Sequence, residues 1–345
     1  MNLDGKLRLD ARAERANKDA AEMNVHLRQL ESLRAGAAIS VLDKHKIIQV
    51  AGEDAEAFLQ GQLSSDVREL SDESHAQYSS YSSAKGRMLA SFLVWRSDGV
   101  YCLAVSADLA EYVAKRLSMF VLRSKVKVSI ADNLTLIGLA GATALNTLAI
   151  EPALAASVGP REMIRVELGL LIGLPGAGWV LAVDEAGAEQ LGARLTEAAS
   201  LVSSSVWDWR DIDAGIPWIS LATQEQFVPQ MANMELIGGV SFKKGCYPGQ
   251  EIVARSQYLG KMKRRMFKVA FKRPLAIGAK LYSPSVAGQS IGMVAAVCQV
   301  APDQYEGLAV VQFQAWEEGI YADEAYTIRL QQLELPYSLN EGAEN

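Results

Sequence analysis

The spacing of apolar residues predicts mixed α and β structure, with short strands, amphipathic helices and tight turns. The elements expected before residue 131 are a strand over 46–50, a helix over 53–62, a hairpin over 87–105, a helix over 107–119 and a strand over 124–130. Asp98-Gly99 separates the two apolar runs of the hairpin, and such pairs favour tight two-residue turns. The N-terminal stretch 1–36 is charged and carries one apolar stripe at helical spacing, which predicts a helical arm.

An internal repeat links two parts of the chain. Residues 101–117 align without gaps on residues 179–195, with seven of the 17 positions identical, and each copy reads as a strand followed by an amphipathic helix. The uncharged run 133–150 is interrupted by Asn, Thr and Gly, so it predicts a buried strand and a helix rather than a membrane span. We therefore expect two related α+β modules packed face to face, with an interface suited to a ligand cleft.

A glycine-rich stretch in the second module raises the question of a dinucleotide site. Gly176 and Gly178 precede a strand, whereas the glycines of a phosphate-binding loop connect a strand to a helix N-terminus. The stretch therefore predicts a hairpin turn.

The chain after residue 262 reads as strands alone. Its short apolar or alternating runs are separated by Pro, Gly, Asp and Ser clusters, which is typical of a small antiparallel barrel or sandwich. The predicted organisation is a charged helical arm over 1–36, a first α+β module over 37–130, a second over 131–260, a C-terminal antiparallel β-barrel over 261–335 and a tail over 336–345.

Composition narrows the class of protein. The chain has 345 residues, 50% of them hydrophobic, and three cysteines without paired spacing. The charged N-terminus lacks the pattern of a secretory signal, so we expect a cytoplasmic protein without disulfides or a membrane span. Cys102 and Cys298 lie within apolar runs and are expected in the core. The cysteines and three histidines lack the spacing of metal ligands, so no metal site is predicted.

Charge is distributed unevenly along the chain. Residues 243–273 contain ten Lys or Arg and a single acid, Glu251, although the whole chain has a net charge of −6. The remaining residues carry 24 basic and 39 acidic side chains. This segment suggests an anionic partner, and the alternative is a solvated face of strands and loops.

The remaining cysteine, Cys246, lies in this basic segment. Gly245 and Gly249 interrupt regular structure around it, and residues 250–258 are predicted to form a helix. A turn ahead of a helix, with Lys244 adjacent, can lower the pKa of a thiol from about 8.5 by one or more units. We therefore regard Cys246 as a candidate reactive thiol, with Lys244 assisting it.

Two charged residues of the predicted helix accompany the thiol. Glu251 and Arg255 fall at positions i and i+4, where they can pair on one helix face. The competing interpretation of this loop is that Cys246 is a small residue filling a turn, without chemistry.

The stretch KGCYPGQEIVAR, residues 244–255, resembles the signature of the YgfZ family, folate-binding relatives of the glycine-cleavage T-protein. Other pieces that fit the family in order are FLQGQLSSDV (58–67), KGRMLASF (85–92), LRSKV (122–126), GIPWI (215–219), QFVPQMANM (226–234) and LPYSL (335–339). The resemblance runs from about residue 40 to residue 340, so it covers nearly all of the chain beyond the arm.

The resemblance implies a fold of two interlocked α+β modules around a central cavity, followed by a β-barrel. It also implies tetrahydrofolate binding in that cavity and a role in tRNA modification, through iron–sulfur enzymes that methylthiolate tRNA. Of two tryptophans that the family uses against folate, one matches Trp207 and the other falls on His45. Trp207 and Trp209, spaced at i and i+2, fit core positions of a strand equally well.

Other side chains suit the parts of a folate. Aromatic rings can stack on the pterin, and carboxylates or amides can accept its N–H groups. The further candidates for these contacts are Tyr247, Gln250, Gln60, Asp66 and Gln226. The basic loop would attract the anionic glutamate tail.

Three functions compete at this point. The first is a folate-dependent maintenance factor for iron–sulfur proteins, with a reactive cysteine loop and no complete active site of its own. The second is a tetrahydrofolate-dependent aminomethyltransferase, which only kinship of fold favours. The third is a tRNA-binding module, ranked last because the acidic remainder of the chain would repel RNA. No DNA partner is expected.

Overall fold

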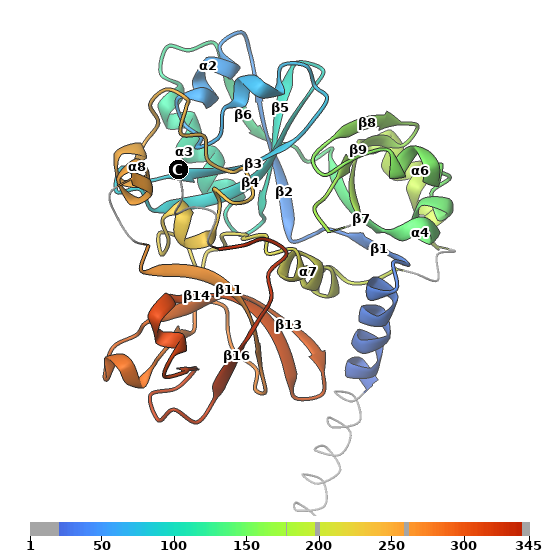
Figure 1. Ribbon diagram of the computed structural model, residues 1–345. Helices are drawn as coiled ribbons and strands as arrows, with labels where there is room; N and C mark the ends of the chain where they lie inside the picture. The colour runs from blue at the N-terminus through green and yellow to red at the C-terminus, as the bar shows by residue number, and fades with distance from the viewer. Residues whose placement is uncertain (1–20, 177, 197–200, 259–261, 340–345) are drawn as a thin grey trace, which may run out of the picture.

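The computed structural model describes residues 21–176, 178–196, 201–258 and 262–339, which form three antiparallel sheets (Figure 1). The first sheet has the strand order β3-β4-β5-β2-β6. Its elements are β2 (His45–Ala51), α2 (Ala55–Gln60), η1 (Val67–Leu70), β3 (Gln77–Ser82), β4 (Met88–Ser97), β5 (Val100–Ser106), α3 (Ala110–Val121) and β6 (Lys127–Ile130). The predicted hairpin is confirmed, because Asp98 and Gly99 connect β4 to β5 with φ angles of 52° and 76°.

The second sheet has the order β1-β7-β10-β9-β8. Its elements are β1 (Ala38–Val41), β7 (Thr135–Ala140), α4 (Gly141–Thr147), α5 (Pro152–Ala156), β8 (Met163–Val166), β9 (Gly169–Gly173), β10 (Trp179–Val183) and α6 (Glu185–Thr196). The predicted strand-then-helix repeat is confirmed by β10 and α6, which match β5 and α3. A hairpin joins β9 to β10, as the glycine-rich stretch predicted. Strand β1 precedes the first sheet in sequence but pairs with β7, so the two modules interlock.

Side-chain alternation along β7 builds two layers of core. Leu136 and Ala140 belong to the large core that the two sheets share. Ile137 and Leu139 point to the opposite face and pack in a second core with residues of α4, α5 and α6. Each sheet therefore has helices near one face and the other module near the other face.

The C-terminal sheet has the order β12-β13-β14-β11-β16-β15. Its strands are β11 (Arg264–Phe271), β12 (Lys280–Leu281), β13 (Gly292–Ala301), β14 (Gln304–Gln312), β15 (Ile320–Tyr321) and β16 (Arg329–Leu333). The two edge strands meet through an antiparallel bridge between Tyr282 and Tyr321, whose backbone groups exchange two hydrogen bonds of 2.8 Å. The predicted small antiparallel barrel is therefore confirmed.

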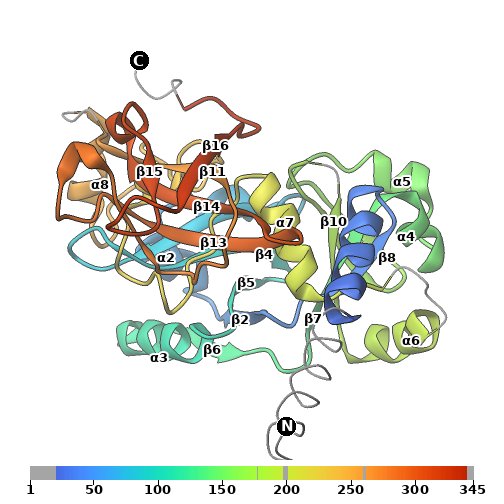
Figure 2. The same ribbon diagram turned by 90° about the horizontal axis from the view of Figure 1, so that it is seen from below.

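Helix α7 (Ser204–Asp213) lies where the three sheets meet, as Figure 2 shows from below. It contacts β1, β13 and β14. The interpretation of Trp207 and Trp209 as strand residues is wrong, because both lie on this helix. Helical geometry turns them to different surroundings: Trp207 is buried between the modules, whereas the Trp209 Nε1 donates to Glu306 of the barrel at 2.9 Å.

A helix over residues 21–34 belongs to the predicted arm, of which the first 20 residues lie outside the described part of the chain. Its Leu30 and Leu33 are buried in the large core, so this part of the arm is packed down. Residues 340–345 of the predicted tail likewise lie outside the described part of the chain. Within the described ranges, no helix has both the length and the apolar character needed to cross a membrane.

Candidate functional site

A cleft of about 610 Å³ opens where the first sheet, α7 and the barrel meet. Its walls come from the ends of β2 and β5, from one face of α7 and from β13. The residues that line it are Asp43, Lys44, His45, Ser106, Ala107, Asp108, Ser204, Ser205, Asp208, Asp211, Ile212, Ile216, Trp218, Ser220, Ile277, Ala295, Ala296 and Val297. The volume falls in the range typical of small-molecule and cofactor sites, about 300–1,000 Å³.

His45, the first residue of β2, forms one wall of the cleft. Its ring meets Trp218 edge to face, with 4.2 Å between centroids and 62° between planes. Its Nδ1 is buried and has no hydrogen-bond partner among the described residues. Burial is the main cause that lowers the pKa of His45, with Asp211 opposing, so the ring is neutral at neutral pH. A buried ring nitrogen without a partner suits a ligand atom that can donate or accept.

Two carboxylates from α7 face the same cleft, one helical turn apart. Asp208 is paired with Lys44, yet burial raises the pKa of Asp208 to about 6. Asp211 accepts a hydrogen bond from Trp218 Nε1 at 2.8 Å and one from Arg210 at 3.2 Å. Acceptors fixed in this way can receive the N–H groups of a heteroaromatic ring.

Trp207 lies deeper, in the wall of a second hollow of about 20 Å³ between the two sheets. His45, Asp211 and Trp218 line both spaces, so this hollow adjoins the cleft. Gly138 of β7 lets the indole approach, because a Cβ there would lie 2.6 Å from the Trp207 ring. The two residues that match the family's tryptophans, His45 and Trp207, are therefore brought to one place.

The cysteine loop occupies a different part of the surface. Cys246 is exposed, and none of the described residues 243–258 lines the cleft. The neighbouring Lys244 is buried, and its Nζ donates to the carbonyl oxygens of Gln60, Leu63 and Ser65 at 2.8, 2.5 and 2.9 Å. Burial lowers the pKa of Lys244 to about 8. Lys244 thus anchors the loop to the segment that follows α2.

The helix after the loop, α8 (Gln250–Tyr258), is placed by a glycine. Gly249 has a φ of 79°, and a Cβ on it would lie 2.5 Å from the carbonyl oxygen of Ser83 and 2.6 Å from Cα of Gly86. This contact presses the loop against the turn between β3 and β4. Glu251 and Arg255 are exposed on α8, one turn apart as predicted, but they form no ion pair within 4 Å in the described structure.

Several predicted folate contacts lie outside the cleft. Asp66 caps η1 and pairs with Arg68, and the Gln60 amide donates to Asp66 at 3.0 Å. Tyr247 is buried beneath Lys244, whose Nζ lies 5.1 Å from the ring centroid. Gln250 begins α8, and Gln226 is exposed and donates to the Gln224 carbonyl at 3.3 Å. Asp66, Gln60 and Tyr247 therefore belong to the surroundings of the cysteine loop.

Sequence reasoning missed Lys44, Asp208, Asp211 and Trp218 as cleft residues. The spacing of Asp208 and Asp211 at i and i+3 was an available signal, but it becomes meaningful only if the segment is read as a helix. Cys102 and Cys298 are buried, as predicted, and burial raises the pKa of each thiol to about 12. No group of three or more His, Cys, Asp or Glu within the described residues is placed to hold a metal ion.

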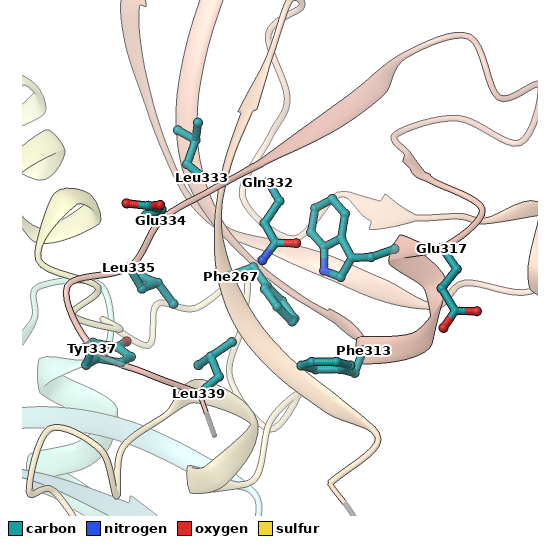
Figure 3. Close-up of a pocket in the computed structure, with 10 residues that line it drawn as sticks. Phe267, Phe313, Glu317, Gln332, Leu333, Glu334, Leu335, Tyr337 and Leu339 are labelled. Carbon is teal, nitrogen blue, oxygen red and sulfur yellow. The ribbon is translucent and has the colours of Figure 1, made fainter. Parts of the chain in front are cut away.

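A separate cavity of about 690 Å³ lies on the barrel, between Phe267 and Phe313 on one side and the C-terminal segment on the other (Figure 3). Leu335, Tyr337 and Leu339 form the wall on that side. The Tyr337 hydroxyl donates to the Gly215 carbonyl at 2.7 Å, which holds the segment across the barrel. The cavity contains none of the residues predicted for folate or for the thiol.

Comparison with known proteins gives concordant results. The chain is 33% identical over 240 residues to the tRNA-modifying protein YgfZ of Klebsiella pneumoniae (strain 342), covering 69% of this chain and 73% of that protein. It is 30% identical over 319 residues to the tRNA-modifying protein YgfZ of Escherichia coli O127:H6 (strain E2348/69 / EPEC), covering 90% and 96%. No protein-family model matches.

Among solved structures, the fold is similar to the glycine cleavage system aminomethyltransferase T from Bartonella henselae. The TM-score is 0.70 at 18% identity, over 90% of this chain and 88% of that one. The likeness at this identity shows a shared fold.

Proposed function

The chain belongs to the family of tRNA-modifying YgfZ proteins, and from this premise we propose that it binds a tetrahydrofolate in the cleft around His45. We further propose that it supports tRNA methylthiolation by maintaining the iron–sulfur enzymes that carry it out. The observation that carries the folate assignment is the buried, unpartnered Nδ1 of His45 in a cleft that also holds two carboxylates.

The lining of the cleft suits the chemistry of a pterin. A pterin is flat and presents several N–H donors beside ring acceptors, so it needs an aromatic wall and fixed acceptors. His45 and Trp218 supply aromatic surface, and Asp208 and Asp211 supply acceptors. Lys44 pairs with Asp208 and Arg210 pairs with Asp211, and these pairings limit the repulsion of an anionic tail.

Cys246 has a role separate from folate binding in this proposal. Its exposed thiol lies on an anchored loop that does not line the cleft, which favours contact with a partner protein over contact with the pterin. Candidate roles for this thiol are redox chemistry, sulfur relay and ligation of a cluster that the partner carries. Lys244 acts here as a positioning residue, and Glu251 and Arg255 offer charged contacts on the exposed side of α8.

Calorimetric titration of the full chain with a stable reduced folate, 5-formyltetrahydrofolate, tests the cleft. We expect Asp211→Asn to weaken binding about tenfold or more, because it removes a charged acceptor. Asp66→Asn is the matched control, since this carboxylate lies outside the cleft, and it should bind as the wild type does. A wild-type protein that does not bind reduced folate, or equal losses in both variants, would contradict the assignment.

Cys246→Ala separates the two halves of the proposal. We expect this variant to bind folate normally and to fail to restore tRNA methylthiolation in a strain lacking the gene. Full restoration would remove the thiol from the function.

The fold likeness leaves aminomethyl transfer as an alternative that turnover can decide. Release of a methylene-folate from an aminomethyl donor and tetrahydrofolate would support it. No observation in the cleft favours it over folate binding alone.

A further inference from the structure

The fold divides the cations of the basic run 243–273 into those that have partners in the interior and those that remain exposed to solvent. Arg265 is buried and paired with Glu235, and Lys268 is buried with its Nζ 2.6 Å from Asp213 and 3.4 Å from Glu306. The Lys244 Nζ donates hydrogen bonds to three carbonyl oxygens. These three cations therefore stabilise the interior and are not available to an anionic partner.

Lys272 and Arg273 follow the last residue of β11 and remain exposed. Together with Arg329, which lies outside the basic run, they line a groove of about 530 Å³ on the barrel. None of the three makes an ion pair within 4 Å with a residue that the structure describes.

Strand register explains how these charges come together. Ala270 of β11 is opposite Glu306 of β14 and opposite Gln331 of β16. Lys272, which directly follows the last residue of β11, lines the groove together with Gln304 of β14 and Arg329 of β16. The groove therefore collects side chains from three neighbouring strands, β14, β11 and β16, and from the residues that follow β11.

Lys272 and Arg329 line the same groove, and like charges held near one another repel. Of the two carboxylates nearby, Glu306 is engaged by Lys268, whereas Asp323 interacts with Arg273. Glu306 accepts from Trp209 Nε1 at 2.9 Å and pairs with Lys268, and Asp323 accepts from the backbone of Ile328 at 2.8 Å. The three cations are thus only partly compensated, so the groove keeps a positive charge on a chain whose net charge is −6.

We propose that this groove binds the phosphodiester backbone of RNA, and that the RNA is the tRNA whose modification the protein supports. A row of cations across adjacent strands offers contacts to successive phosphates, which a single small anion would not use. Gln304 and Gln331 offer amide groups to 2′-hydroxyls.

This inference goes beyond folate binding and does not depend on it. The groove and the folate cleft share no lining residue, so each can fail without the other. It also moves the RNA contact to one end of the basic run 243–273, because the fold buries Lys244, Arg265 and Lys268 of that run.

Fluorescence anisotropy of a labelled, unmodified tRNA transcript, titrated with the full chain at several KCl concentrations, tests the groove. Three phosphate contacts predict a slope of log K against log [KCl] of about −2 to −3. The double variant Lys272→Gln/Arg329→Gln should reduce that slope by roughly 1.5 and lower affinity about tenfold at 100 mM KCl. Lys280→Gln, an exposed lysine on β12 of the same barrel, is the control and should leave both unchanged.

Further measurements test whether the double variant stays folded and whether the groove is selective for RNA. The double variant should keep or raise the Tm, because it removes a like-charge pair, and it should bind 5-formyltetrahydrofolate as the wild type does. Adenosine monophosphate and tripolyphosphate should not displace tRNA at equal phosphate concentration. Absence of tRNA binding, an equal loss in Lys280→Gln, or displacement by either small phosphate would overturn the proposal. Equal competition by duplex DNA would also overturn its assignment to RNA.

Discussion

At the scale of single residues, the cleft sets two titrating groups against each other. Burial raises the pKa of Asp208 to about 6, and burial lowers the pKa of His45. At neutral pH the carboxylate is therefore charged and the imidazole is neutral. The cleft thus offers one fixed acceptor and one ring nitrogen that can either donate or accept a hydrogen bond. Both shifts arise because the same walls that shape the cleft exclude water from it.

Folate affinity should fall as the pH is lowered through about 6, because protonation of Asp208 removes a charged acceptor. Titrations of the wild type and of Asp208→Asn between pH 5 and pH 8 measure this directly. We expect the variant to bind more weakly at pH 7 and to lose most of the pH dependence. An unchanged pH profile in Asp208→Asn would show that the dependence arises in another group.

The stability of the fold depends on the same carboxyl in the opposite direction to folate affinity: its contribution is largest at low pH and falls as the pH rises. A raised pKa means that the folded chain holds the proton more tightly than the unfolded chain, so Asp208 favours folding at low pH. This contribution is lost as the pH rises from the ordinary value of 3.8 through about 6. Urea unfolding of the unliganded protein over that window should show the decline in the wild type and not in Asp208→Asn.

At the scale of elements, local sequence patterns correctly predicted the hairpin and the barrel strands, which depend on turn residues and side-chain alternation close in sequence. The hairpin at Asp98-Gly99 follows from turn chemistry, and the barrel strands follow from alternation and turn spacing. Helix α7 was harder, because two tryptophans at i and i+2 match a strand as well as a helix. Its carboxylates became visible as a pair only once the helix was established.

The cysteine loop shows the same limit. Glycine and proline predicted a turn before α8, but no local pattern indicated that Lys244 turns inward while Lys243 stays exposed. That difference is set by three carbonyl groups more than 170 residues earlier in the chain. The candidate thiol could thus be chosen from sequence, whereas its separation from the cleft could not.

Lys244→Met should loosen this loop, because three carbonyl oxygens lose their common donor. We expect the free energy of unfolding to fall by about 1–3 kcal/mol, the cost of leaving buried acceptors unsatisfied. Hydrogen exchange should become faster at Gln250, whose N–H bonds to the Tyr247 carbonyl at 3.1 Å. Lys243→Met, a change at the exposed neighbour, is the control, and an equal effect there would argue against an anchoring role for Lys244.

At the scale of the whole molecule, ion pairs distant in sequence connect the barrel to the modules. Arg265 of β11 reaches Glu235, and Lys268 of the same strand reaches Asp213 at the end of α7. Sequence showed the cations as part of one basic run, but their partners lie 30 and 55 residues away. Which charges are internal and which face solvent therefore follows from the docking of the barrel, and only the latter remain for a ligand.

The Arg265–Glu235 pair predicts how strongly that docking depends on a buried charge. The two side chains are 9% and 6% exposed, so Arg265→Met leaves a carboxylate buried without its partner and should lower the free energy of unfolding by about 3–5 kcal/mol. Lys125→Met breaks a pair with Glu53 whose side chains are 71% and 75% exposed, and should cost about 0.2–1 kcal/mol. Urea titrations followed by circular dichroism compare the two.

The pH dependence of this loss identifies its cause. Burial raises the pKa of Glu235 even with Arg265 present, and removal of the guanidinium should raise it further. The folded variant can then take up a proton on Glu235, so the loss in Arg265→Met should shrink as the pH is lowered toward 5. Arg265→Met/Glu235→Leu should recover most of the stability at pH 7, because no uncompensated charge stays buried. A loss that is independent of pH and persists in the double variant would instead indicate that packing of the arginine side chain, rather than its charge, holds the barrel against the modules.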